Sequence, residues 1–172
     1  MKTILCASLL LAVLVFPSHA EDKRPLPNPH IDYAGFLKEA AAVGQLREQR
    51  RISEEQFLRM MSEPGTIVYD ARSDDKYRLL HIKGAKHLSL TDVTAEELTK
   101  ILPDKTTRIL IYCNNNFGKE PVAFAGKGST ASLNIYTFNT LYSYGYKNVF
   151  ELGPFIDINV SKLPFVGERV RK

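Results

Sequence analysis

Cysteine is scarce in this chain: the 172 residues include only Cys6 and Cys113. Cys6 lies in a segment that we expect to be removed, so the mature chain would keep Cys113 alone. A single cysteine excludes an internal disulfide, and a thiol–disulfide oxidoreductase would need a second cysteine to resolve its mixed disulfide. An unpaired thiol in an oxidising compartment is oxidised unless it is buried or used. This shortage favours a reactive role for Cys113 over a purely structural one.

Long apolar runs are also missing after the first residues of the chain. The one early run, Ile4 to Phe16, follows the positive charge of Lys2 and is too short to span a bilayer comfortably. Ser18-His19-Ala20 then provides small residues at the positions of a cleavage site before Glu21. We therefore expect residues 1–20 to be a signal peptide. The product would be exported, periplasmic in a Gram-negative source, with no stable membrane insertion after cleavage.

Neither sign of charge dominates the sequence. The chain has 23 Lys and Arg against 19 Asp and Glu, a formal net charge of +4, and the basic residues are spread among acidic ones. This distribution gives little support for nucleic-acid binding. His30 and His87 have no metal-ligand spacing with each other or with Cys113, so we expect no metal and no other cofactor.

The order of apolar patterns predicts an α/β domain. Residues 21–28 form a polar, proline-rich tether, and apolar residues between Phe36 and Val43 then recur at helical spacing. Ser53 and Thr94 each open a helix with a capping box. Short apolar runs between helices predict a parallel sheet covered on both faces. The expected strands are 66–70, 87–89, 108–112 and 149–152, and a helix should begin at Ser129 or Thr130 and end before Gly145.

Cys113 stands at the end of the most informative strand. Four of the five residues before it are bulky and apolar, which is typical of a strand buried on both faces. Three asparagines follow, Asn114, Asn115 and Asn116, and asparagine tolerates tight backbone well. A thiol at the carboxyl end of a central parallel strand lies where α/β folds place their chemistry. Cys113 is therefore the candidate nucleophile, with a buried structural cysteine as the alternative.

Several segments of the chain together form a family pattern: Ile52-Ser53, Asp70-Ala71-Arg72-Ser73, Tyr77, His81-Ile82-Lys83-Gly84-Ala85, Leu110-Ile111-Tyr112-Cys113, Gly145 to Gly153 and Leu163-Pro164-Phe165. Together they resemble the rhodanese domain family. The resemblance covers residues 50–167 in the family's order. It implies a three-layer α/β domain with a central, mostly parallel sheet and helices on both faces. Residues 21–49 would add the tether and an extra N-terminal helix.

The resemblance implies a sulfurtransferase. Cys113 would accept a sulfane sulfur as a persulfide from a donor such as thiosulfate and pass it to cyanide or a thiol. Asp70, Arg72 and His81 would organise the end of the sheet rather than react. The partners would be a small sulfur donor, a thiol acceptor or a partner protein. The substrate-binding loop would consist of Asn114, Asn115, Asn116, Phe117, Gly118 and Lys119.

The chain departs from the family after Cys113. The family usually has a short loop that runs straight into a helix, whereas residues 114–128 form a longer segment here. This insertion could cover the site, with Lys119 or Lys127 attracting an anionic donor. A phosphatase would need an arginine where Lys119 stands, which disfavours that activity. The alternative function is a rhodanese-like binding or sulfur-carrier module in which Cys113 is silent or accepts sulfur only from a partner protein.

Overall fold

The computed structural model describes residues 28–170 of the chain. The predicted signal peptide and the first part of the tether lie outside the described residues. The chain divides into two units, residues 1–32 and 33–172. The described end of the first unit is a turn, closed by a hydrogen bond of 3.2 Å from the Ile31 N–H to the Asn28 carbonyl.

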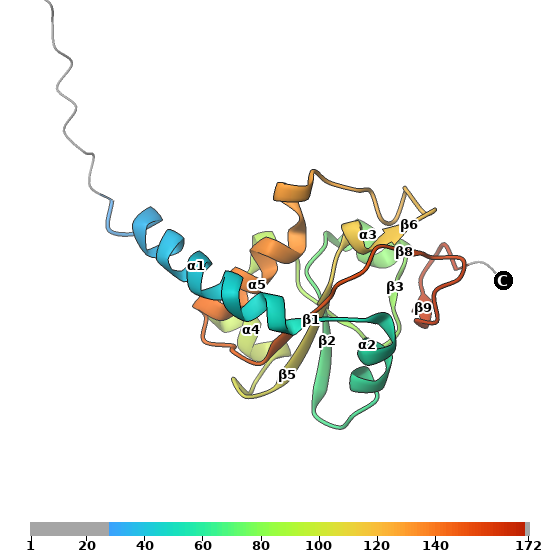
Figure 1. The fold of residues 1–172 in the computed structure, drawn as a ribbon, viewed down its shortest axis with the longest axis horizontal. Coiled ribbons are helices and arrows are strands. Elements are labelled where there is room, and N and C mark those ends of the chain that lie inside the picture. Colours follow the sequence, from blue (N-terminus) through green and yellow to red (C-terminus); the bar gives the residue numbers. More distant parts are fainter. Residues whose placement is uncertain (1–27, 171–172) are drawn as a thin grey trace, which may run out of the picture. The chain divides into compact units, whose positions relative to one another are not determined.

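A five-stranded parallel sheet forms the centre of the second unit (Figure 1). The strands, in spatial order, are β1 (Arg51–Ile52), β7 (Val149–Leu152), β5 (Arg108–Tyr112), β2 (Thr66–Asp70) and β4 (Lys86–His87). All four pairings are parallel. β5 lies in the middle, so it pairs with a neighbouring strand on both sides, with β2 and with β7. The structure confirms the predicted α/β class and the parallel sheet.

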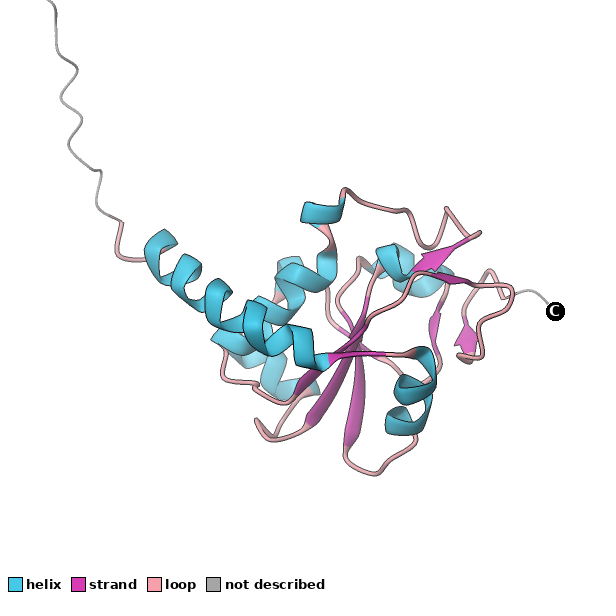
Figure 2. Cartoon of the chain, in the orientation of Figure 1, coloured by secondary structure: helices cyan, strands magenta, loops and turns pink. Residues whose placement is uncertain are grey.

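Helices cover both faces of the sheet, as Figure 2 shows. They are α1 (Tyr33–Arg50), α2 (Glu54–Met61), α3 (Asp74–Leu79), α4 (Ala95–Ile101) and α5 (Leu133–Ser143). β5 alternates between two apolar cores because successive side chains of a strand point to opposite faces. Ile109 and Ile111 pack in the core that includes residues of α1, α4 and α5, whereas Leu110 and Tyr112 pack in the core with Phe57 of α2.

Short elements complete the domain. β3 (His81–Ile82) pairs antiparallel with β9 (Phe165–Val166), and β6 (Phe117–Gly118) pairs parallel with β8 (Ile156–Asp157). Three 3₁₀ turns follow strands or precede helices: η1 (Leu90–Asp92), η2 (Asn114–Asn116) and η3 (Ser129–Ala131). The β6–β8 pair ties the segment after Cys113 to the chain that follows β7.

The predicted N-terminal helix is present as α1 and packs on α5 and β7. It begins at Tyr33 and continues through Gly44 to Arg50. Arg47 near its end forms an ion pair with the buried Glu151 of β7, at 2.5 Å from Nε to Oε2. Because a carboxylate buried in a sheet needs a partner, this pair fixes the end of α1 on the domain.

Two helix starts differ in how well the sequence predicted them. Ser53 forms the full capping box of α2, with Gln56 N–H donating to its hydroxyl at 3.2 Å and its own N–H donating to Gln56 Oε1 at 2.9 Å. The prediction of a helix from Ser129 or Thr130 was wrong. These residues form the turn η3, and α5 starts at Leu133 with Ser132 in the N-cap position.

Residues 28–170 contain no helix whose length and apolar character would suit a membrane span.

Candidate functional site

Cys113 follows the last residue of β5 at the carboxyl edge of the sheet, as predicted. Cys113 is buried, with 1% of its surface exposed. The sulfur Sγ lies 3.5 Å from the hydroxyl Oγ of Ser132, the N-cap residue of α5. Ser132 makes no side-chain capping bond to its own helix, so its hydroxyl is directed to the sulfur instead. The thiol therefore contacts the N-terminal end of α5. This helix begins only after the long segment that follows Cys113.

Ser132 is not among the site residues predicted from the sequence. The signal was available, because a serine directly before an apolar helical pattern is a favourable N-cap. Ser129 and Thr130 satisfy the same capping preference a few residues earlier, so the pattern does not distinguish Ser132 from them.

Asn116 organises the backbone around Cys113. Its Oδ1 accepts hydrogen bonds from the Cys113 N–H at 2.8 Å and from Nδ2 of Asn134 in α5 at 3.1 Å. Its Nδ2 donates to the carbonyl of Leu152 at 2.7 Å and to that of Pro154 at 3.2 Å. One buried amide thus joins the ends of β5 and β7 and the first turn of α5.

Asn114 and Asn115 fasten the far end of the insertion. Asn114 Nδ2 donates to the Ala125 carbonyl at 2.8 Å. Asn115 pairs with the backbone of Lys127 in both directions, at 2.8 Å each. Asn114 Oδ1 is buried and accepts no hydrogen bond from the described residues. The two side chains hold residues 125–127 beside the residues that follow Cys113.

Asp70 and Arg72 form a fully buried ion pair at the end of β2. The guanidinium Nη2 lies 2.6 Å from Asp70 Oδ2 and also donates to the Leu80 carbonyl at 2.7 Å. Burial opposes the charge of Arg72, but the hydrogen bond and charge of Asp70 outweigh it, so the pKa of Arg72 is raised. Nη1 of Arg72 donates to the Ala123 carbonyl at 3.0 Å. The pair therefore organises the sheet end and also anchors the insertion.

His81 and His87 both stack on Tyr77, with ring centroids 3.7 Å and 4.5 Å away. His81 Nδ1 lies 2.7 Å from the Tyr77 carbonyl, and His87 Nε2 lies 2.8 Å from the Arg72 carbonyl. None of the contacts described for either histidine joins it to Cys113. Within residues 28–170, no three His, Cys, Asp or Glu side chains come together as ligands for a metal ion.

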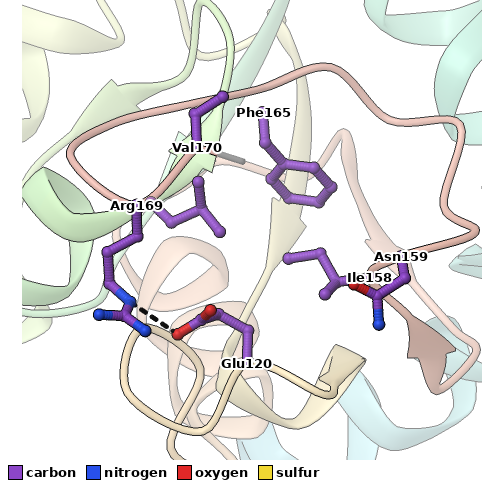
Figure 3. Close-up of a pocket in the computed structure, with 7 residues that line it drawn as sticks. Glu120, Ile158, Asn159, Phe165, Arg169 and Val170 are labelled. Carbon is purple, nitrogen blue, oxygen red and sulfur yellow. Dashed lines mark hydrogen bonds and ion pairs between the residues drawn. The ribbon is translucent and has the colours of Figure 1, made fainter. Parts of the chain in front are cut away.

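The first half of the insertion is fastened by charged side chains. Glu120, whose side chain is 5% exposed, pairs with Arg169 near the C-terminus at 2.8 Å from Nε to Oε1. Lys76 Nζ donates to the Val122 carbonyl at 2.7 Å. Figure 3 shows the Glu120–Arg169 pair in the wall of a cavity of about 340 Å³, next to the apolar side chains of Ile158 and Phe165. The insertion is thus a packed part of the domain rather than a free loop.

Two further hollows flank the insertion near Cys113. One, of about 380 Å³, lies at the ends of β2 and β4 and is lined by Arg72, Ser89 and Thr91, among other residues. The other, of about 340 Å³, is an open hollow lined by the insertion and Phe155. Both are lined by Asn114 and Lys127, so the residue after the thiol contacts two cavities.

Comparison with known proteins identifies a domain family. The model of the rhodanese-like domain matches residues 53–153, which is more than half of the chain and includes Cys113 and the insertion. A search of curated proteins found no match.

Solved structures are similar at low identity. The Alr3790 protein from Anabaena sp. is 21% identical, with 69% of this chain and 94% of that chain covered and a TM-score of 0.49. A rhodanese with anions from E. coli is 21% identical, with 59% and 98% covered and a TM-score of 0.40. The BH2092 protein from Bacillus halodurans is 21% identical, with 69% and 77% covered and a TM-score of 0.45.

Proposed function

Because the chain belongs to the rhodanese-like domain family, we propose that it is a sulfurtransferase whose Cys113 carries the sulfur as a persulfide. The observation that carries this proposal is the position of Cys113 Sγ, at the carboxyl edge of the central strand and 3.5 Å from the Ser132 hydroxyl. Catalytic groups of open α/β sheets gather at this edge.

The proposed reaction has two displacement steps without net oxidation. The Cys113 thiolate attacks the sulfane sulfur of a donor such as thiosulfate, and a new S–S bond forms while the S–S bond of the donor breaks. The electron pair of the broken bond leaves with sulfite. A nucleophile such as cyanide then attacks the outer sulfur of the persulfide, and Cys113 leaves as a thiolate.

The start of α5 provides the stabilisation that an anionic sulfur needs. The Cys113 N–H already donates to Asn116, so it does not serve the sulfur. The Ser132 hydroxyl is within reach of the sulfur, and the first N–H groups of an α-helix have no partners within the helix. These N–H groups and the helix dipole favour a negative charge at the N-terminus of this eleven-residue helix. The proposal therefore assigns Ser132 as a second residue that touches the reacting sulfur.

Burial of Cys113 sets a condition on this function. With 1% exposure, its sulfur is reached by a donor only when a neighbouring segment moves. Residues 125–127 are the segment held by Asn114 and Asn115 through three hydrogen bonds. We propose that this segment opens to admit the donor.

Mass spectrometry tests the sulfurtransferase directly. The purified protein is incubated with thiosulfate, and the Cys113→Ser variant serves as the control. We expect a mass increase of one sulfur atom on Cys113 and the release of thiocyanate when cyanide is added.

The burial of Cys113 also favours a second candidate, a binding module whose thiol does not react. This module would recognise a partner protein through its surface. The two functions are distinguished with the Asn115→Ala variant, in which the insertion is loosened. This variant is incubated with thiosulfate, and sulfur bound to Cys113 is measured. Absence of any sulfur adduct in this variant as well as in the wild type would favour the binding module.

A further inference from the structure

The open hollow of about 340 Å³ beside Phe155 is formed by the part of the chain that departs from the family pattern. We call it the insertion hollow, and Cys113 is not among its lining residues. A ligand in an open hollow keeps part of its own surface in water, whereas small ligands bind in pockets that bury most of theirs. The insertion hollow therefore suits a segment of a larger molecule.

The insertion hollow carries positive charge without a balancing negative charge. Lys119 and Lys127 line it, both are exposed, and none of its lining residues is acidic. Neither ammonium group makes a hydrogen bond or ion pair with the residues that the structure describes. Glu120, the chain neighbour of Lys119, is buried and paired with Arg169 in another cavity. The two ammonium groups therefore favour an anionic ligand.

An exposed aromatic ring forms the apolar wall of the insertion hollow. Phe155 is 75% exposed, and the exposed Pro121 also lines the hollow. The ring lies against Gly118: a Cβ atom at position 118 would be 2.6 Å from Cζ of Phe155, so a larger residue there would displace the ring. Aromatic side chains are enriched where proteins bind other proteins. The ring is thus a candidate contact for an apolar side chain of a partner.

Lys119 is held in a backbone conformation that costs free energy. Its φ of +67° makes it the one non-glycine residue with positive φ in residues 28–170. Glycine adopts this conformation readily, whereas another residue adopts it only where the surroundings fix it. The pairing of Gly118 with Asp157 fixes the backbone directly before Lys119. Such strain is concentrated at functional sites, and here it places an ammonium group at the hollow.

The number of charges distinguishes between classes of anionic macromolecule. Nucleic-acid binding needs a basic stripe that contacts several phosphates. Attraction to an anionic membrane needs a cluster of about four to eight Lys or Arg residues. Two lysines beside an apolar wall match neither pattern. A protein segment needs only one or two carboxylates, and its apolar side chains can cover the exposed ring.

We propose that the insertion hollow is a docking site for a partner protein, and that it binds an acidic segment in which carboxylates flank an apolar side chain. The carboxylates lie beside Lys119 and Lys127, and the apolar side chain lies against Phe155. No step of this binding uses the thiol of Cys113. The docking site therefore does not rest on the proposed sulfurtransferase.

A defined peptide tests the chemistry of the partner. The peptide is blocked at both ends and has two aspartates that flank a leucine, and its affinity is measured by NMR titration. The matched control peptide has asparagine in place of both aspartates. We expect saturable binding that is about tenfold weaker for the control peptide, because two exposed ion pairs are lost, and that weakens with added salt. Absence of saturable binding, or equal affinity of the two peptides, would overturn the proposal.

Variants of the protein locate the bound peptide. We expect Lys119→Met to weaken binding about threefold, because one exposed ion pair is lost, and Phe155→Ala to weaken it about tenfold, because an aromatic contact is lost. Lys83→Met, an exposed lysine outside the hollow, is the matched control. Lys119→Gly should weaken binding as Lys119→Met does, but with a higher denaturant midpoint, because glycine relieves the strain. Unchanged binding in Phe155→Ala, or equal effects of Lys119→Met and Lys83→Met, would overturn the proposal.

Two further measurements separate the docking site from its alternatives. Single-stranded DNA and vesicles of anionic lipid are titrated against the same variants, and tighter binding to either with the same dependence on Lys119 would overturn a protein partner. Peptide affinity is also measured in Cys113→Ser, where we expect no change. If thiosulfate loads no sulfur onto Cys113 while the peptide binds, the proposed sulfurtransferase fails and the docking site stands.

Discussion

Asn115 offers a direct test of whether the insertion controls access to Cys113. Its side chain is half-exposed and contacts the insertion through two hydrogen bonds with the Lys127 backbone, each of 2.8 Å. Asn115→Ala removes both bonds. Because the Lys127 N–H and carbonyl belong to an exposed residue, water can replace the lost partner. The substitution should therefore loosen residues 125–127 without unfolding the domain.

The expected size of the effect follows from the bonds removed. A hydrogen bond contributes about 0.5–1.5 kcal/mol net, so two bonds contribute about 2 kcal/mol. A change of about 1.4 kcal/mol is tenfold in an equilibrium constant, which gives about a thirtyfold larger open population. When opening and closing are fast relative to the chemical step, the rate of modification follows this population. Alkylation of Cys113 should therefore accelerate about thirtyfold.

The assay measures the rate at which iodoacetamide alkylates Cys113, followed by mass spectrometry. Asn148→Ala is the matched control, since Asn148 also makes two side-chain hydrogen bonds, with Thr106 and Arg50, away from the insertion. Denaturant midpoints of both variants show whether the domain itself is weakened. An unchanged alkylation rate in Asn115→Ala, with a normal midpoint, would refute the view that residues 125–127 cover the thiol.

Three further predictions concern other parts of the chain. Ser132→Ala should slow sulfur loading about tenfold at an unchanged denaturant midpoint, because Ser132 makes no capping bond to α5; a lowered midpoint would contradict this. Arg72→Met should lower the free energy of unfolding by about 3–5 kcal/mol, because it leaves the Asp70 carboxylate buried and unpaired. Arg78→Met, an exposed arginine, is its control, and equal effects would contradict the reasoning. Finally, expression in a Gram-negative host should yield a product whose N-terminal residue is Glu21, and an intact N-terminus would contradict the predicted signal peptide.

The central strands could be predicted from the sequence because their environment is uniform. β2 and β5 lie inside the sheet with helices on both faces, so the residues between their ends are apolar, and the polar residues Thr66, Asp70 and Arg108 lie at the strand ends. The predicted ranges 66–70 and 108–112 agree with the observed strands. The position of Cys113 follows from the end of β5, and so the place of this thiol at the carboxyl edge of the sheet could be predicted without structural information.

The path of the insertion could not be predicted in the same way. Several of its contacts are hydrogen bonds or ion pairs between residues far apart in the sequence, such as Asn116 with Leu152 and Glu120 with Arg169. The periodic spacing of apolar residues predicts helices and strands, but nothing in the sequence indicates which distant residue a polar side chain will bond to. The left-handed backbone at Lys119 is equally hidden, because local sequence favours glycine or asparagine for that conformation. The contact of Ser132 with Cys113 could not be predicted for a related reason, since Ser129 and Thr130 satisfy the same capping pattern.

The attachments of the insertion divide it into two parts with different freedom. Residues 117–124 are fixed by the β6–β8 pairing, by the buried Glu120 with Arg169, and by the Arg72 guanidinium on the Ala123 carbonyl. Residues 125–128 depend on neutral amide bonds from Asn114 and Asn115.

Charge-assisted and buried contacts are stronger than neutral, exposed ones. Gly126 and Gly128 make the second part more flexible, because glycine backbone is less restricted than that of other residues. No other atom lies within 4 Å of the place where a Cβ would stand at either position, so neither glycine is held by close packing. Opening should therefore start at residues 125–128, which Asn114 and Asn115 hold, while residues 117–124 stay in place. An insertion built in this way can open in its second part while the β6–β8 pair and the Glu120–Arg169 ion pair keep its first part packed.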